Sequence, residues 1–110
     1  MKLLVFVLNR TEKLEPVLNK LEHLGLRGAT VLESRGMAMT LENYFDGSFI
    51  GSLRAVLEPD REENRTVFMA LKDEDVQRAV AAIEEAAGSF DSPNSGIAFT
   101  LPLDFVKGIQ

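Results

Sequence analysis

The feature that most constrains the fold of this chain is the order of its elements, because a strand, a helix and a second strand follow one another twice. Short apolar runs rich in β-forming residues predict the strands, and apolar residues at helical spacing predict the helices. Connections of this kind are right-handed. Two of them in a small domain predict a ferredoxin-like α+β sandwich, in which two helices cover one face of a four-stranded antiparallel sheet. The predicted strands are residues 2–8, 28–34, 65–71 and 96–101.

Both predicted helices carry an apolar stripe and are followed by a glycine. Gly25 and Gly88 stand where a helix commonly ends on a residue with a positive φ. Thr11 and Asp73 are placed to cap the helix starts, because their side-chain oxygens accept hydrogen bonds from unpaired backbone N–H groups. The apolar stripes are Leu14, Val17, Leu18, Leu21 and Leu24 in the first helix, and Val76, Ala79, Val80, Ile83 and Ala87 in the second.

The first and third strands are apolar on both faces. Two helices can cover only one face of the sheet, and soluble monomers rarely expose a large apolar patch. The other face must therefore be covered by the insertion between strands two and three, residues 37–64, or by another subunit. In the first strand the two faces are Leu3, Val5 and Val7 on one side, and Leu4, Phe6 and Leu8 on the other.

Length and composition exclude several classes of protein. The 110 residues predict a single domain over 1–110, long enough to bury a core. The chain has no cysteine, which excludes disulfides and makes the cytoplasm the expected location. Lys and Arg total 12 against 17 Asp and Glu, and this net charge of −5 argues against a nucleic-acid surface. No apolar run approaches the roughly 20 residues that a membrane span needs.

Three stretches of the chain resemble the nitrogen-regulatory PII-type signal proteins: "KLEPVLNKLEHLGLRGATVLESRG" at 13–36, "ALKDEDVQRAVAAIEEAAG" at 70–88 and "SGIAFTLPLDFVKGI" at 95–109. The resemblance implies a homotrimer whose open sheet faces pack around the threefold axis. It implies clefts between subunits that bind ATP or ADP, often with 2-oxoglutarate. It also implies a regulatory role in nitrogen metabolism, without catalysis, in which a long loop between strands two and three contacts a target protein.

The residues that bind nucleotide phosphates in the family are largely replaced here. By the resemblance, an arginine and a glutamine after strand two correspond to Met39 and Thr40, and a lysine at the fourth strand corresponds to Ile97. A late arginine pair corresponds to Gly108 and Gln110. Buried phosphates need cationic partners, so we predict that ordinary ATP binding is lost. A different small effector stays open as the alternative. The remaining cleft residues implied by the family are Thr30, Gly36, Asn94, Ser95 and Gly96.

The insertion takes the place of the family's signalling loop and contains an amphipathic pattern at 49–57. Five apolar side chains fall within an arc of about 120° on a helical wheel. Ser48 can cap this predicted helix and Pro59 ends it. The helix would pack on its own trimer, dock a partner protein, or lie on a membrane surface. The apolar arc is Phe49, Ile50, Leu53, Val56 and Leu57, and the partner-binding candidates are Tyr44, Phe49, Ile50, Leu53 and Arg54.

Other functions stay open at this stage. A CutA-type trimer associated with divalent ions, or a purely structural trimer, would share the fold, although His23 has no companion ligand at a recognisable spacing. A small phosphate-ester hydrolase would need an Arg-bearing, glycine-rich loop after strand one, and "NRTEK" at 9–13 lacks that character. Tyr44 lies where the family sometimes carries a nucleotidylylated tyrosine, and an aromatic that only packs is the alternative there.

Overall fold

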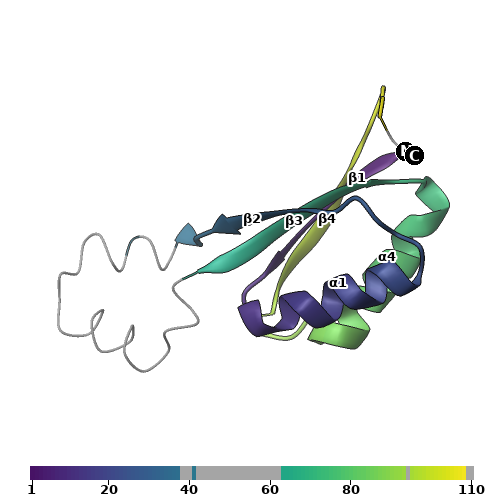
Figure 1. Cartoon of the computed structure of the whole chain (residues 1–110). Coiled ribbons are helices and arrows are strands. Elements are labelled where there is room, and N and C mark those ends of the chain that lie inside the picture. Colours follow the sequence, from purple (N-terminus) through teal and green to yellow (C-terminus); the bar gives the residue numbers. More distant parts are fainter. Residues whose placement is uncertain (38–40, 42–62, 94, 109–110) are drawn as a thin grey trace, which may run out of the picture.

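The computed structural model of the chain describes residues 1–37, 41, 63–93 and 95–108 (Figure 1). Within these residues, four strands and two helices follow one another in the predicted order. A short 3-10 turn precedes each helix. The strands are β1 (Lys2–Leu8), β2 (Thr30–Ser34), β3 (Asn64–Leu71) and β4 (Gly96–Pro102), the helices are α1 (Leu14–His23) and α4 (Val76–Ala87), and the turns are η1 (Thr11–Lys13) and η3 (Asp73–Asp75).

The four strands form one antiparallel sheet in the order β2-β3-β1-β4. The ferredoxin-like α+β prediction is therefore confirmed. The second strand begins at Thr30, two residues later than predicted, because Gly28 has a φ of +90° and turns the chain before the strand starts. The pairing places Val5 of the central strand β1 opposite Phe68 of β3 and opposite Phe99 of β4. The side chains of the three strands therefore lie in rows across the sheet.

The core lies between the sheet and the two helices, which cover the same face of the sheet (Figure 1). Alternate residues of β1 and β3 point into this core, as the period of two in a strand requires. The helices contribute their predicted stripes in part: Leu24 is exposed, and Ala82 is buried although the predicted stripe omitted it. The buried strand residues are Leu4, Phe6, Leu8, Val67, Met69 and Leu71, and the buried helix residues are Val17, Leu21, Ala79, Ala82 and Ile83.

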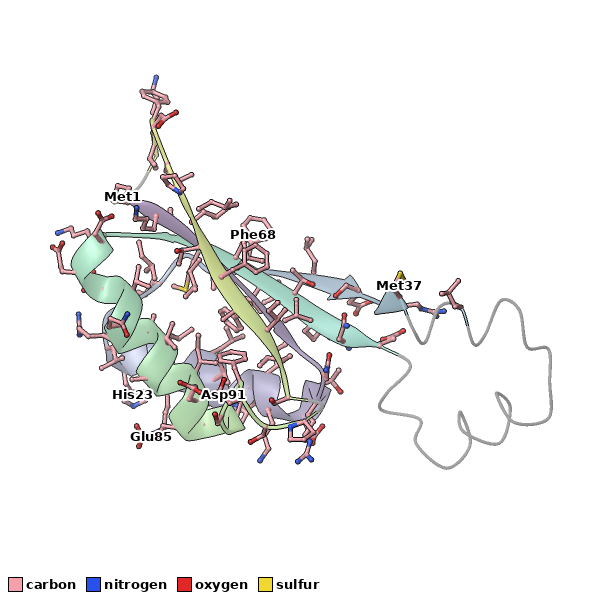
Figure 2. The ribbon with its side chains drawn as sticks, turned by 180° about the vertical axis from the view of Figure 1, so that it is seen from behind. Met1, His23, Met37, Phe68, Glu85 and Asp91 are labelled. Carbon is pink, nitrogen blue, oxygen red and sulfur yellow. The ribbon has the colours of Figure 1, made fainter. Side chains whose placement is uncertain are left out.

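The opposite face of the sheet is also apolar, and neither α1 nor α4, the two described helices, lies over it (Figure 1). Figure 2 shows Phe68 projecting from this face, away from both helices. On the edge strand β4, Ile97, Phe99 and Leu101 are 56%, 45% and 48% exposed. The prediction that the central strands are apolar on both faces is thus confirmed. We call this surface the open face; its apolar members are Leu3, Val5, Val7, Leu32, Phe68, Ala70, Ile97, Phe99 and Leu101.

The helix starts differ from the prediction. No side-chain hydrogen bond caps α1 or α4, so neither Thr11 nor Asp73 acts as a cap. The physical reason is the 3-10 turn before each helix, in which the N–H groups of Lys13 and Asp75 donate to carbonyls three residues earlier, at 3.1 and 2.9 Å. The carboxylate of Asp73 instead binds the amino group of Met1 at 3.0 Å.

The predicted insertion, residues 37–64, is described only at positions 37, 41, 63 and 64. The amphipathic helix predicted at 49–57 lies outside the described residues, so it stays a prediction. Within the described ranges, no helix is long and apolar enough to cross a membrane.

Candidate functional site

A cavity of about 520 Å³ lies on the open face, at the end of the sheet where β1 and β2 finish and β3 and β4 begin. The antiparallel order of the sheet brings these four strand ends together, although they are far apart in the sequence. Its volume is within the range of about 300–1,000 Å³ that is usual for small-molecule pockets. The residues that line the cavity are Val7, Asn9, Ser34, Arg35, Gly36, Asn64, Thr66, Gly96 and Ile97.

Three polar side chains from β2 and β3 form a hydrogen-bonded cluster in the wall of the cavity. The hydroxyl of Ser34 donates to the side-chain oxygen of Asn64, and its oxygen lies 2.7 Å from the hydroxyl oxygen of Thr66. Ser34 and Asn64 are directly opposite each other in the strand pairing, and Thr66 is two residues further along β3 on the same face. The three side chains are half-buried. We call them the hydroxyl–amide cluster.

Among the described residues that line the cavity, Arg35 is the one charged side chain. The neighbouring Arg65 is directed elsewhere: its Nη1 lies 3.3 Å from a carboxylate oxygen of Glu63 and 3.1 Å from the carbonyl oxygen of Asn64. Arg65 also sits opposite Leu8 in the pairing, which places it on the helix side of the sheet. The described lining of the cavity therefore combines a single positive charge with neutral hydrogen-bonding groups.

Gly36 and Gly96 border the cavity for different reasons. Gly96 has a φ of +128°, and a β-carbon there would overlap the carbonyl oxygen of Val7. Glycine at position 96 is therefore required by the close approach of β4 to β1. A β-carbon at Gly36 would lie 3.6 Å from the side-chain nitrogen of Asn64, which is an ordinary contact. As far as the described residues show, position 36 thus tolerates a side chain in steric terms, whereas position 96 does not.

The structure brings together part of the cleft that the sequence predicted. Gly36 and Gly96 both line the cavity, and the carbonyl of Ser95 accepts a hydrogen bond from the N–H of Asn9 at 3.5 Å beside it. Thr30 stands at the opposite end of β2 from Ser34 and does not line the cavity. Outside the described residues lie Asn94, Tyr44, Phe49, Ile50, Leu53 and Arg54.

Sequence reasoning missed the hydroxyl–amide cluster and Arg35. The signal was the polar end of strand two, "ESR", facing the polar start of strand three, "NRT". Each is an ordinary strand end when read alone. Only the register, which sets Ser34 against Asn64 and leaves Thr66 on the same face, turns them into one site.

A second cavity, of about 650 Å³, lies between α1 and α4 on the far side of the molecule. Figure 2 shows His23 and Glu85 at this helical surface. Its charged groups already join the two helices: Lys20 pairs with Glu85 at 2.5 Å, and Arg78 binds the carbonyl of Leu24 at 3.3 Å. His23 contacts the carbonyl of Asn19 through Nδ1 at 2.7 Å. These contacts explain the groove as part of the helix packing.

A cluster of metal-binding side chains would favour the alternative of a trimer associated with divalent ions. Within the part of the chain that the structure describes, no group of three or more His, Cys, Asp or Glu side chains converges in a way that would hold an ion. The described residues thus offer a small-molecule cavity and an apolar sheet face as the two surfaces that need a functional explanation.

Comparison with known families gives a match over the entire chain. Residues 1–110 match the family model described as Nitrogen regulatory protein P-II. A search of curated proteins found no match to the chain.

Proposed function

We propose that this chain, which belongs to the P-II family of nitrogen regulatory proteins, assembles as a homotrimer and regulates a target protein through effector-dependent contacts. In this proposal residues 1–110 form one PII-like unit that acts in the cytoplasm, in nitrogen metabolism, and catalyses no reaction. The family match supports the regulatory class. The apolar open face is the single observation that carries the assembly.

The open face has the character of a subunit interface. Its side chains form continuous rows across three strands, of which Phe99, Val5 and Phe68 make up one. Fully burying a large apolar side chain is worth about 1.5–3 kcal/mol, and the three large residues of β4 are about half exposed in the single chain. Because α1 and α4 lie on the other face, packing against further copies would gain that energy. P-II proteins are typically trimers, which supports three as the number of copies.

The position of the cavity supports a role for an effector. Val7 and Ile97 belong to the open face and also line the cavity, so a copy packed on that face would border a bound ligand. Gly36 lines the cavity as well, and the insertion begins at the next residue. A ligand in the cavity would therefore touch both the subunit interface and the start of the segment that takes the place of the family's signalling loop.

The chemistry of the cavity favours binding over catalysis. The hydroxyls of Ser34 and Thr66 bond to each other and to an amide, and neither is paired with a base from the described residues that would activate it as a nucleophile. These groups are arranged to recognise a ligand.

The assembly is tested by light scattering of the purified protein at micromolar concentration. We expect the mass of three copies. Phe99→Glu should dissociate or unfold the trimer, because it buries an unpaired charge in the interface; a monomer would tolerate it, since Phe99 is 45% exposed there. The matched control is Gln77→Glu, which adds the same charge at an exposed position of α4 and should leave the mass unchanged. A monomeric wild type, or a trimer unaffected by Phe99→Glu, contradicts the proposal.

A further inference from the structure

We infer that the cavity at the end of the open face takes a small hydroxy-monocarboxylate, with Arg35 holding the carboxylate and the hydroxyl–amide cluster receiving the hydroxyl. The inference rests on the proposed function, because it names the class of effector for the same cavity. It departs from the nucleotide polyphosphates that P-II family membership suggests.

The charge of the cavity selects a ligand with one negative charge. Arg35 is the one charged residue among the described residues that line it, and no carboxylate of the described chain is paired with it. A guanidinium matches a carboxylate with two parallel hydrogen bonds. A polyphosphate brings several negative charges to a site whose described residues supply one cation, and charges taken out of water without partners are costly. A monocarboxylate is neutralised by Arg35 alone.

The protons of the hydroxyl–amide cluster select the second group of the ligand. A side-chain amide oxygen can only accept, so the single hydroxyl proton of Ser34 is committed to Asn64. The contact of 2.7 Å between the two hydroxyl oxygens then requires Thr66 to donate its proton to Ser34. Both hydroxyl protons are used within the cluster. Thr66 is left with oxygen lone pairs, which accept a hydrogen bond from a ligand hydroxyl and repel a phosphate oxygen.

The test is an NMR titration of the trimeric full-length protein with three probes. Lactate has one carboxylate and one hydroxyl, lactamide is its neutral counterpart of similar shape, and tripolyphosphate carries several charges. We expect lactate to shift the backbone amide signals of Ser34, Gly36 and Thr66 in a saturable way, and to bind more tightly than either other probe.

Variants assign the contact to its residues. Arg35→Gln should weaken lactate binding about tenfold or more, because it removes a charge-assisted hydrogen bond, and Arg35→Lys should retain part of the affinity. Thr66→Val should weaken lactate but leave the response to acetate, which lacks the hydroxyl, unchanged. Arg27→Gln is the matched control, since it removes an exposed arginine that does not line the cavity. If Arg35 had a purely structural role, lactate affinity would not fall from Arg to Lys to Gln at position 35 while the melting temperature stayed constant.

The outcomes separate this inference from the proposed function. In protein that scatters as a trimer, tighter binding of tripolyphosphate than of lactate overturns the inference alone. So does an absence of saturable lactate binding, or unchanged affinity in Arg35→Gln. A wild type that scatters as a monomer overturns the proposed assembly, whatever the titration gives.

Discussion

Gly96 lies against Val7 so closely that a β-carbon at position 96 would overlap the Val7 carbonyl oxygen. This contact joins the first residue of β4 to the central strand β1, at the end of the sheet that holds the cavity. Gly96, which the family resemblance assigns to ligand binding, is therefore also needed for the structure, because the backbones of β4 and β1 approach at a distance that only glycine permits.

Gly96→Ala should destabilise the protein by about 2–5 kcal/mol, which combines the strain of a positive φ with the displacement of a packed strand. Gly25→Ala is the control, because Gly25 also has a positive φ, of +79°, but faces open space. It should cost only about 1–2 kcal/mol. Urea unfolding of both variants measures the difference. Equal losses would show that the contact with Val7 adds nothing to the cost of the backbone conformation.

Asp73 should make stability depend on pH in the acid range. The hydrogen bond from the Met1 amino group, helped by the charges of that group and of Lys2, lowers the pKa of the Asp73 carboxyl from 3.8, against a smaller opposing effect of desolvation. A depressed folded-state pKa means that the stabilisation is complete above the unfolded pKa and is lost as pH falls through the folded value. Asp73→Asn should therefore lower the melting temperature slightly at neutral pH.

The difference between wild type and Asp73→Asn should disappear once the pH is below the folded pKa of Asp73. It should also shrink at high salt, because this pair is exposed to solvent. Glu74→Gln removes the adjacent exposed carboxylate and provides the control for net charge. A melting-temperature difference that persists unchanged into strong acid would rule out the pair as its source.

ATP with magnesium should give no saturable heat in calorimetry at neutral pH. The reason is the shortage of cations: the described lining of the cavity has Arg35 alone, and Ile97 stands where the family resemblance implies a lysine. Ile97→Lys puts a cation back at that position and should raise the affinity for ATP if charge is what is missing. Micromolar binding of ATP to the unmodified protein would refute the prediction.

The insertion should contain a helix over 49–57. An isolated helix of this length is marginal in water and needs packing to be stable, so backbone amides at 53–57 should exchange with deuterium more slowly than those of a random coil. Replacing Phe49 and Leu53 with Ser should lower the melting temperature if the helix packs on the trimer. If the helix docks a partner, the trimer should keep its stability and lose the partner. Random-coil exchange at 53–57 would exclude a packed helix in either role.

Much of the fold was predictable from local chemistry. Apolar alternation set the strands, and the glycines at 25 and 88 ended the helices, because these signals depend on residues next to each other in the chain. The two apolar faces of β1 were also predictable, since side chains alternate with a strict period of two. The helix starts were not predictable, because the choice between a side-chain cap and a 3-10 turn depends on which partners compete for the capping side chain. The carboxylate of Asp73 pairs with the amino group of Met1, which is distant in the sequence.

By itself the sequence determined the order of the elements and the apolar character of both sheet faces, because each can be read from neighbouring positions in the chain. Only the tertiary structure decided which polar residues share a site. Ser34 and Asn64 are 30 residues apart and become partners through the pairing of β2 with β3. Likewise, only the approach of β4 to β1 decided that position 96 must be glycine. Strand register depends on how the strands pair in the packed sheet, so it cannot be read from the sequence of any one segment.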